Sequence, residues 1–183
     1  MIPAAEDIQA IVKGCIDNNR KAQERLYKLF YIALGAICMR YTKNEQDAIE
    51  VLNDGFLKIF KNIQHYDERK GALYTWMSRI VTNCCIDFLR KQQDVYFNPV
   101  EQHSEDIHLD NSALQNIDAQ ELLALIRQLP PSTQLVFNLH VIEGYPHKEI
   151  AVLLGMREGT SKWHVNEARK QLQKKLQVMA AAS

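Results

Sequence analysis

The chain has 183 residues and a formal net charge of zero, with 22 Lys and Arg against 22 Asp and Glu. This length allows one medium domain or two small ones. No apolar run approaches the roughly 20 residues of a membrane span. The first residues, MIPAAEDIQA, lack the charged and apolar segments of a signal peptide. We therefore expect a cytoplasmic protein.

The cysteine and histidine residues do not show the spacing of a metal-binding motif. The six histidines have no partner at zinc-ligand spacing, and the four cysteines form no C-x-x-C pair. We expect free, buried thiols and neither a metal nor a cofactor. The cysteines are Cys15, Cys38, Cys84 and Cys85.

Helical periodicity dominates the first half of the sequence. Asn44 is a suitable capping residue for the third predicted helix, whose early turns carry Glu45, Asp47 and Glu50, where the helix dipole favours anions. Turn-forming residues lie between Asp67 and Gly71. The four helices are expected at about residues 8–18, 20–41, 45–63 and 73–92.

The sequence contains no strand pair, no glycine-rich phosphate loop and no catalytic-triad pattern. Pairs of acidic residues occur, but on helices they are typical of solvated faces. We therefore predict an all-α fold class and a protein that is not an enzyme, with no catalytic residues and no small-molecule substrate.

Charge is divided into blocks along the chain. Residues 8–93 have a net charge of +5, residues 94–120 hold six acids and no Lys or Arg, and residues 121–183 have a net charge of +3. The acidic stretch lacks helical periodicity and is too long for an ordinary loop. We expect domains at 1–93 and 118–183, joined by a flexible acidic linker at 94–117, with two basic surfaces available to DNA.

Near the C-terminus the sequence GYPHKEIAVLLGMREGTSKWHVNEAR predicts two helices joined by a short turn. The first is expected from His147 to Leu154, the turn at Gly155 to Arg157, and a longer basic helix from Glu158. Gly155 suits the left-handed turn, and the small Ala151 lets the helices cross closely. This is the helix-turn-helix layout, whose second helix enters the DNA major groove.

The second of these helices has distinct inner and outer faces. The inward set is Ser161, Val165, Ala168, Leu172 and Leu176, with Ile150, Leu153 and Leu154 inward on the first helix. The outer face is polar and mostly cationic, and it includes Trp163 and Asn166, which can contact base edges or thymine methyl groups. The spacing alone also fits an ordinary helical hairpin with a solvated basic face.

Residues 47–92, DAIEVLNDGFLKIFKNIQHYDERKGALYTWMSRIVTNCCIDFLRKQ, resemble region 2 of bacterial sigma factors, and residues 121–176 resemble their region 4. The two-domain form without regions 1.1 and 3 is that of the extracytoplasmic-function (ECF) group, and GTSK at Gly159–Lys162 is most similar to Bacteroidetes-type members. The resemblance implies a transcription initiation factor. Its partners would be the β′ clamp and β flap of core RNA polymerase, promoter DNA and an anti-sigma factor.

In the family, an acidic amphipathic helix binds the β′ clamp. The matching stretch is Asp47–Phe60, in which Glu50, Asn53 and Asp54 share one helix face. Phe56, Leu57 and Phe60 are expected mostly in the core, with Phe56 at the rim of the interface. The resemblance thus implies a polymerase-binding set of Asp47, Glu50, Asn53, Asp54, Phe56 and Leu57.

Residues 65–83 match the part of the family that opens the −10 element. Opening requires cations for the single-stranded backbone and a pocket for a flipped base. Tyr74 and Trp76 fit helix core equally well, and Met77 stands where primary sigma factors have the second Trp of a melting wedge. The implied −10 set is Tyr66, Arg69, Lys70, Tyr74, Trp76, Arg79, Asn83, Arg90 and Lys91.

For the −35 element, the family reads bases with outward residues of the recognition helix. Lys162, Trp163, Asn166 and Glu167 match those positions, although a basic residue is frequent where Glu167 stands, and whether it contacts a base stays open. The cations expected at phosphates are Lys148, Arg157, Arg169 and Lys170.

Two other functions fit parts of the sequence. One is a helix-turn-helix regulator that never joins polymerase, against which the region 2 resemblance argues. The other is an interaction module sequestered by an anti-sigma factor, which would be the same molecule in an inactive state. Binding to core polymerase and promoter-dependent transcription separate these alternatives.

Overall fold

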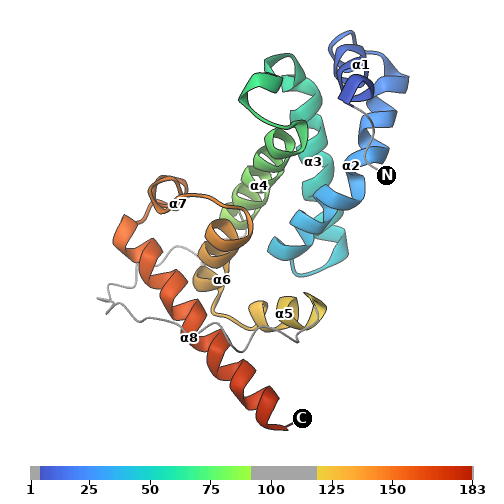
Figure 1. Cartoon of the computed structure of the whole chain (residues 1–183). Helices are drawn as coiled ribbons and strands as arrows, with labels where there is room; N and C mark the ends of the chain where they lie inside the picture. The colour runs from blue at the N-terminus through green and yellow to red at the C-terminus, as the bar shows by residue number, and fades with distance from the viewer. Residues whose placement is uncertain (1–4, 92–118, 183) are drawn as a thin grey trace. The chain divides into compact units, whose positions relative to one another are not determined.

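The computed structural model describes residues 5–91 and 119–182, which form two compact units, Met1–Gln92 and Gln93–Ser183 (Figure 1). All regular structure in the described residues is helical, with no strand, so the predicted all-α fold class is confirmed. The linker predicted at 94–117 lies outside the described residues. None of the described helices is both long and apolar enough to cross a membrane.

The first unit contains four α-helices and two short 3-10 turns. Asn19 and Asn44 cap the second and third helices, since their side chains accept hydrogen bonds from backbone N–H groups of the first turn. The first helix ends earlier than expected, because Asn18 takes a left-handed conformation with φ 55°. The elements are α1 (Ala5–Ile16), α2 (Arg20–Tyr41), α3 (Glu45–Asn62), η1 (Ile63–His65), η2 (Glu68–Lys70) and α4 (Leu73–Lys91).

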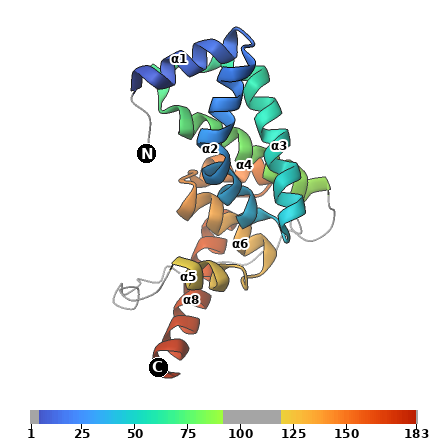
Figure 2. The same ribbon diagram turned by 90° about the vertical axis from the view of Figure 1, so that its right-hand side faces the viewer.

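Helices α2, α3 and α4 pack against one another around an apolar core, and α1 covers the N-terminal end of α2 (Figure 2). All four cysteines are free and buried, as predicted, and burial raises the pKa of the Cys15 and Cys84 thiols. The largest fully buried side chains of this unit include Leu26, Leu34, Ile37, Leu52, Ile59 and Met77.

The crossing of α3 and α4 depends on a glycine. A Cβ atom added at Gly55 would lie 2.9 Å from Val81 Cγ2. We expect Gly55→Ala to destabilise the first unit by about 1–3 kcal/mol, the range for overpacking a core. Urea unfolding followed through Trp76, in a Trp163→Phe background that leaves one of the two tryptophans, measures this change.

Gly159→Ala is the matched control for that substitution. Gly159 is also helical, but nothing lies within 4 Å of an added Cβ. Followed through Trp163 of the same unit in a Trp76→Phe background, this change is expected to alter stability by no more than about 1 kcal/mol, through helix propensity alone. Equal effects of the two alanines would contradict close packing at Gly55.

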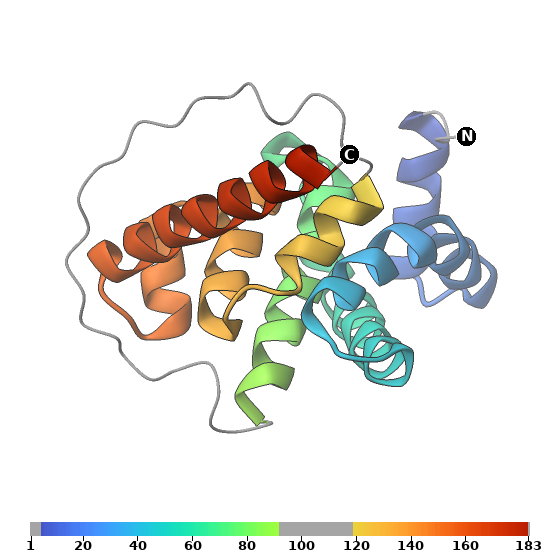
Figure 3. The same ribbon diagram turned by 90° about the horizontal axis from the view of Figure 1, so that it is seen from below.

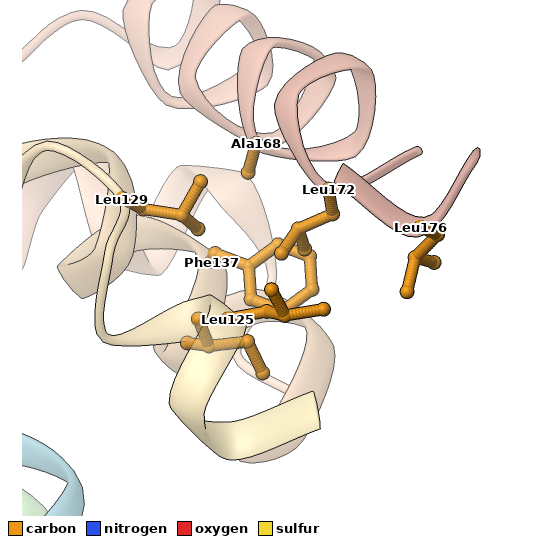
Figure 4. Packing of buried hydrophobic residues seen from close by; sticks show 7 residues of the cluster. Leu125, Leu129, Phe137, Ala168, Leu172 and Leu176 are labelled. Atoms are coloured by element: carbon orange, nitrogen blue, oxygen red, sulfur yellow. The ribbon is translucent and has the colours of Figure 1, made fainter. Parts of the chain in front are cut away.

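The second unit comprises α5 (Ala119–Ile126), α6 (Pro131–Phe137), η4 (Asn138–Ile142), α7 (His147–Leu154) and α8 (Glu158–Ala182). Helices α5, α6 and α7 all pack on the long α8 (Figure 3). Side chains from α5, the α5–α6 turn, α6 and α8 meet in one cluster (Figure 4). Its members are Leu125, Ile126, Leu129, Phe137, Ala168, Leu172 and Leu176.

The helix before the helix-turn-helix changes its type partway along. Pro131 begins α6, the α-helix ends at Phe137, and the chain continues as a π-helical turn, η4. Residues 135–139 are buried without interruption, so this segment has no exposed polar face and the sequence lacks the usual 3.6-residue period there.

The helix-turn-helix itself follows the sequence prediction. Gly155 has φ 65° at the end of α7, and Met156 N donates to Ala151 O at 3.0 Å, which closes the turn. Ile150 and Leu154 are buried, and Leu153 is half-buried. The inward set of α8, Ser161, Val165, Ala168, Leu172 and Leu176, is buried throughout.

Candidate nucleic-acid and polymerase interfaces

The outer surface of α3 is acidic and exposed. Glu50, Asn53 and Asp54 are all exposed, and Tyr27 of α2 donates a hydrogen bond from its hydroxyl to Asn53 Oδ1 at 3.4 Å. Asp47 is half-buried and belongs to the cap of the helix, since its carboxylate accepts a hydrogen bond from Asn44 Nδ2. The charge of this surface therefore comes mainly from Glu50 and Asp54.

The exposure of two apolar residues of α3, Phe56 and Leu57, differs from the sequence prediction. Phe56 is only 2% exposed and packs on Tyr27, with ring centroids 4.4 Å apart, so its side chain does not lie at the rim of this surface. Leu57, expected mostly in the core, is 68% exposed. The inward stripe is Leu52, Phe56 and Ile59, and Leu57 is turned about 100° away from it.

A hollow of about 400 Å³ lies between the end of α3, η1 and α4. It brings together two predicted residues, Trp76 and Asn83, which lie two turns apart on the same face of α4. Three polar neighbours were missed, although the i, i+4 spacing of Lys58 and Asn62 could have suggested a shared face. We call this site the α4 hollow; its lining is Lys58, Asn62, His65, Trp76, Ile80 and Asn83.

The loop between α3 and α4 is held by its own side chains. The Tyr66 hydroxyl donates to Gly71 O at 3.1 Å, and its ring lies 5.7 Å from that of Trp76. Arg69 donates two hydrogen bonds to the Asp67 carboxylate, at 3.0 and 2.9 Å, which lowers the pKa of Asp67. Arg69 and Lys70 are both exposed, and Arg69 is paired with Asp67 within the loop.

The remaining predicted −10 residues lie apart from the α4 hollow. Tyr74 is 41% exposed and stacks on Phe30, with centroids 6.3 Å apart. Arg79, Arg90 and Lys91 are exposed on α4, where Arg90 lies 3.5 Å from Asp87. Exposed cations therefore follow α4 from the hollow to its C-terminal end.

The outer face of α8 carries the predicted −35 residues. Lys162 is exposed and pairs with Glu158 at 2.9 Å. Trp163, Asn166 and Glu167 are half-buried; Trp163 meets His164 edge-on, and Glu167 accepts a hydrogen bond from Gln171 at 2.7 Å. The cations predicted to hold phosphates are exposed, namely Lys148, Arg157, Arg169 and Lys170.

Histidines join the helices of this unit, which the sequence did not reveal. His164 is 4% exposed, with Nδ1 3.0 Å from Thr133 Oγ1 of α6. His147 begins α7, lies 2.9 Å from Ser161 Oγ of α8 through Nδ1, and stacks on His140 with centroids 3.9 Å apart. These contacts fix the start of α7 and the outward direction of the α8 face.

We expect the second unit to lose stability as the pH falls. Burial lowers the pKa of His164 and His147 below the usual 6.5, and His140 and Lys162 lower that of His147 further, whereas Glu167 opposes the shift at His164. The unfolded chain then binds more protons, so stability is full above about pH 6.5 and falls below it.

Thermal unfolding followed through Trp163, in a Trp76→Phe background, tests this between about pH 7.5 and about pH 5.5. His164→Gln keeps a polar group near Thr133 but does not titrate, so its midpoint should depend less on pH. The same pH dependence in wild type and variant would show that His164 is not responsible.

Comparison with known proteins gives two family matches, residues 26–95 with Sigma-70 region 2 and residues 119–172 with Sigma-70, region 4, which together cover more than half of the chain. ECF RNA polymerase sigma factor SigE of Mycolicibacterium smegmatis is 26% identical over 158 residues, 84% of this chain and 58% of that protein. ECF RNA polymerase sigma-E factor of Haemophilus influenzae is 23% identical over 181 residues, 92% of this chain and 95% of that protein.

Solved structures are similar in fold. The sigma factor RpoE of Bartonella quintana, solved in complex with the anti-sigma factor NepR, is 22% identical, with a TM-score of 0.53 over 85% of this chain and 96% of that one. The Bacteroidetes-type likeness of Gly159–Lys162 stays a prediction.

Proposed function

The chain belongs to the extracytoplasmic-function group of RNA polymerase sigma factors, and we propose that it binds core polymerase through α3 and reads promoters through the α4 hollow and α8. Regulatory initiation of transcription, not catalysis of its own, is the activity that this family performs. We infer that it acts in the cytoplasm, where core polymerase and promoter DNA meet. Residues 1–93 would serve as region 2, residues 94–117 as a tether and residues 118–183 as region 4.

The α4 hollow is the observation that carries this proposal. It combines an aromatic face, Trp76, with an amide, Asn83, and a cation, Lys58. An unstacked base can stack on an indole, hydrogen-bond to an amide through its Watson–Crick edge, and leave its phosphate beside an ammonium group. The exposed cations of α4 would hold the rest of the opened strand.

Recognition of a second promoter element would come from α8. Lys162, Trp163 and Asn166 lie in its first turns, the part of a recognition helix that reaches base edges, whereas Arg169 and Lys170 lie further along and suit phosphates. The two units would thus read the −35 and −10 elements, and the tether would set their reach.

Protein partners would use the remaining surfaces. The acidic face of α3, with Glu50, Asn53, Asp54 and Leu57 exposed, offers a polar surface with one apolar side chain to the β′ clamp. The β flap would contact the second unit. Because the Bartonella quintana sigma factor was solved with an anti-sigma factor, we propose a partner of that kind here as well.

Run-off transcription tests the function. Core polymerase from the same organism, with the purified chain, is expected to transcribe selected members of a randomised promoter library. Asn83→Ala should change the preferred base at one −10 position. A chain that binds DNA but neither captures core polymerase nor supports transcription would instead be a regulator that acts without polymerase.

A further inference from the structure

Asp87 of α4 contacts one cation from each of two helices. Its Oδ2 atom lies 3.3 Å from Lys58 Nζ of α3, and its Oδ1 atom lies 3.5 Å from Arg90 Nη1, about one turn further along α4. Each carboxylate oxygen therefore faces a different cation. Because Lys58 lines the α4 hollow, Asp87 is connected to the hollow through that side chain.

Asp87 itself lies just outside the α4 hollow. It follows Asn83, a lining residue, by four positions, so the two side chains share one face of α4. The side chains of Asp87 and Lys58 are 48% and 50% exposed, and ion pairs as exposed as this one contribute little to folding stability. A carboxylate at this place would also repel the phosphates of a bound strand, so neither the fold nor affinity for DNA accounts for it.

The bond to Asp87 restricts where Lys58 can act. An ammonium group has three N–H donors, and the bond to Asp87 uses one of them, so Lys58 can keep this bond and still donate to a phosphate. Held in this way, its ammonium group stays at the lining of the α4 hollow and reaches a phosphate that arrives there. Without Asp87, the flexible four-carbon stem would let Lys58 follow phosphates of any sequence.

We propose that Asp87 is a positioning residue for promoter recognition, which directs Lys58 toward the phosphate next to the unstacked base in the α4 hollow and keeps Lys58 and Arg90 from phosphates elsewhere. This inference rests on the proposed function. Asp87 then contributes selectivity and not affinity: it lowers binding to DNA without a matching −10 element and leaves binding to a matching element nearly unchanged.

Asp87→Asn tests this role, because the amide has the shape of the carboxylate without its charge. Holoenzyme is bound to two fork-junction DNAs without a −35 element, one with the −10 sequence selected in the run-off experiment and one with that sequence scrambled. Affinity for the scrambled fork should rise roughly 2- to 5-fold, the range for one exposed ion pair, and affinity for the selected fork should change by less than about 2-fold. The rise should shrink as the salt concentration increases, since exposed charges are then screened.

Three further variants separate positioning from a general effect of charge. Glu24→Gln removes one negative charge from another exposed ion pair, with Lys28 of α2, and should leave the ratio of the two affinities as in wild type. In a chain that carries Lys58→Met and Arg90→Met, Asp87→Asn should no longer change this ratio, because the cations that Asp87 positions are absent. Asp87→Glu keeps the charge and should keep most of the selectivity. Unchanged thermal midpoints of the variants establish folding.

Three outcomes overturn the proposal: an equal rise in affinity for both forks, no rise for the scrambled fork, or an effect of Asp87→Asn that persists in the chain without the two cations. Failure of the proposed function would look different, because wild-type holoenzyme would then bind the two forks equally or would bind neither, and the role of Asp87 would be refuted with it.

Discussion

Replacing Glu50 and Asp54 together by Lys is expected to abolish holoenzyme formation while leaving the first unit folded. Both side chains are exposed and share one face of α3 with Asn53. Neither side chain is part of the core, to which α3 contributes Leu52, Phe56 and Ile59 from its opposite side. Placing like charges across an interface costs several kcal/mol, so affinity for core polymerase should fall by roughly 100-fold or more.

The measurement is a titration of labelled core polymerase with each variant. Asp17→Lys with Glu24→Lys makes the same change in net charge at two exposed positions that are not part of α3, and this control should bind core as wild type does. Circular dichroism checks that both double variants unfold at the wild-type temperature. Wild-type affinity of the Glu50/Asp54 variant would move the polymerase-binding site to another surface.

Helix positions could be predicted from the sequence where periodicity and end signals agree. The predicted limits of α2 and α7 match the structure. Asn44 caps the start of α3 through its side chain, and Gly155 ends α7 with a positive φ, both as expected. The inward set of α8 is also correct, because small and apolar residues recur there at a helical spacing that the cationic residues do not interrupt.

The features of the sites that could not be predicted from the sequence depend on contacts between distant segments. The α4 hollow needs Lys58 and Asn62 of α3 to face Trp76 and Asn83 of α4, and no local pattern fixes how two helices rotate against each other. The same holds for Phe56, whose burial depends on Tyr27 of α2. His164 likewise finds its partner Thr133 in another helix.

Met77 shows how the structure refines a comparison within the family. It stands where primary sigma factors carry the second Trp of a melting wedge, and it is fully buried, with 0% exposure. A core methionine does not insert between base pairs. If α4 opens the −10 element as we propose, Trp76 would act there without a second tryptophan.

For −35 recognition, Asn166→Ala and Lys170→Ala are expected to behave differently. Asn166 is a half-buried amide on the face of α8 that carries Lys162 and Trp163, and an amide can bond an adenine edge with two hydrogen bonds. Its loss should cost about 1–3 kcal/mol at one base position and relax the preference there. Lys170 is exposed and further along the helix, so its loss should weaken all promoters alike.

Binding of each variant to a panel of single-base −35 substitutions, at several salt concentrations, makes the distinction. Lys170→Ala should lower the salt dependence of binding by about one phosphate contact, and Asn166→Ala should leave it unchanged. Glu167→Gln completes the set: Gln171 already donates to the Glu167 carboxylate, so a base contact would appear as a change at one position only. A loss of affinity that is equal for all −35 sequences in Asn166→Ala, or limited to one base position in Lys170→Ala, would contradict these roles. Bases would then be contacted from the C-terminal half of α8.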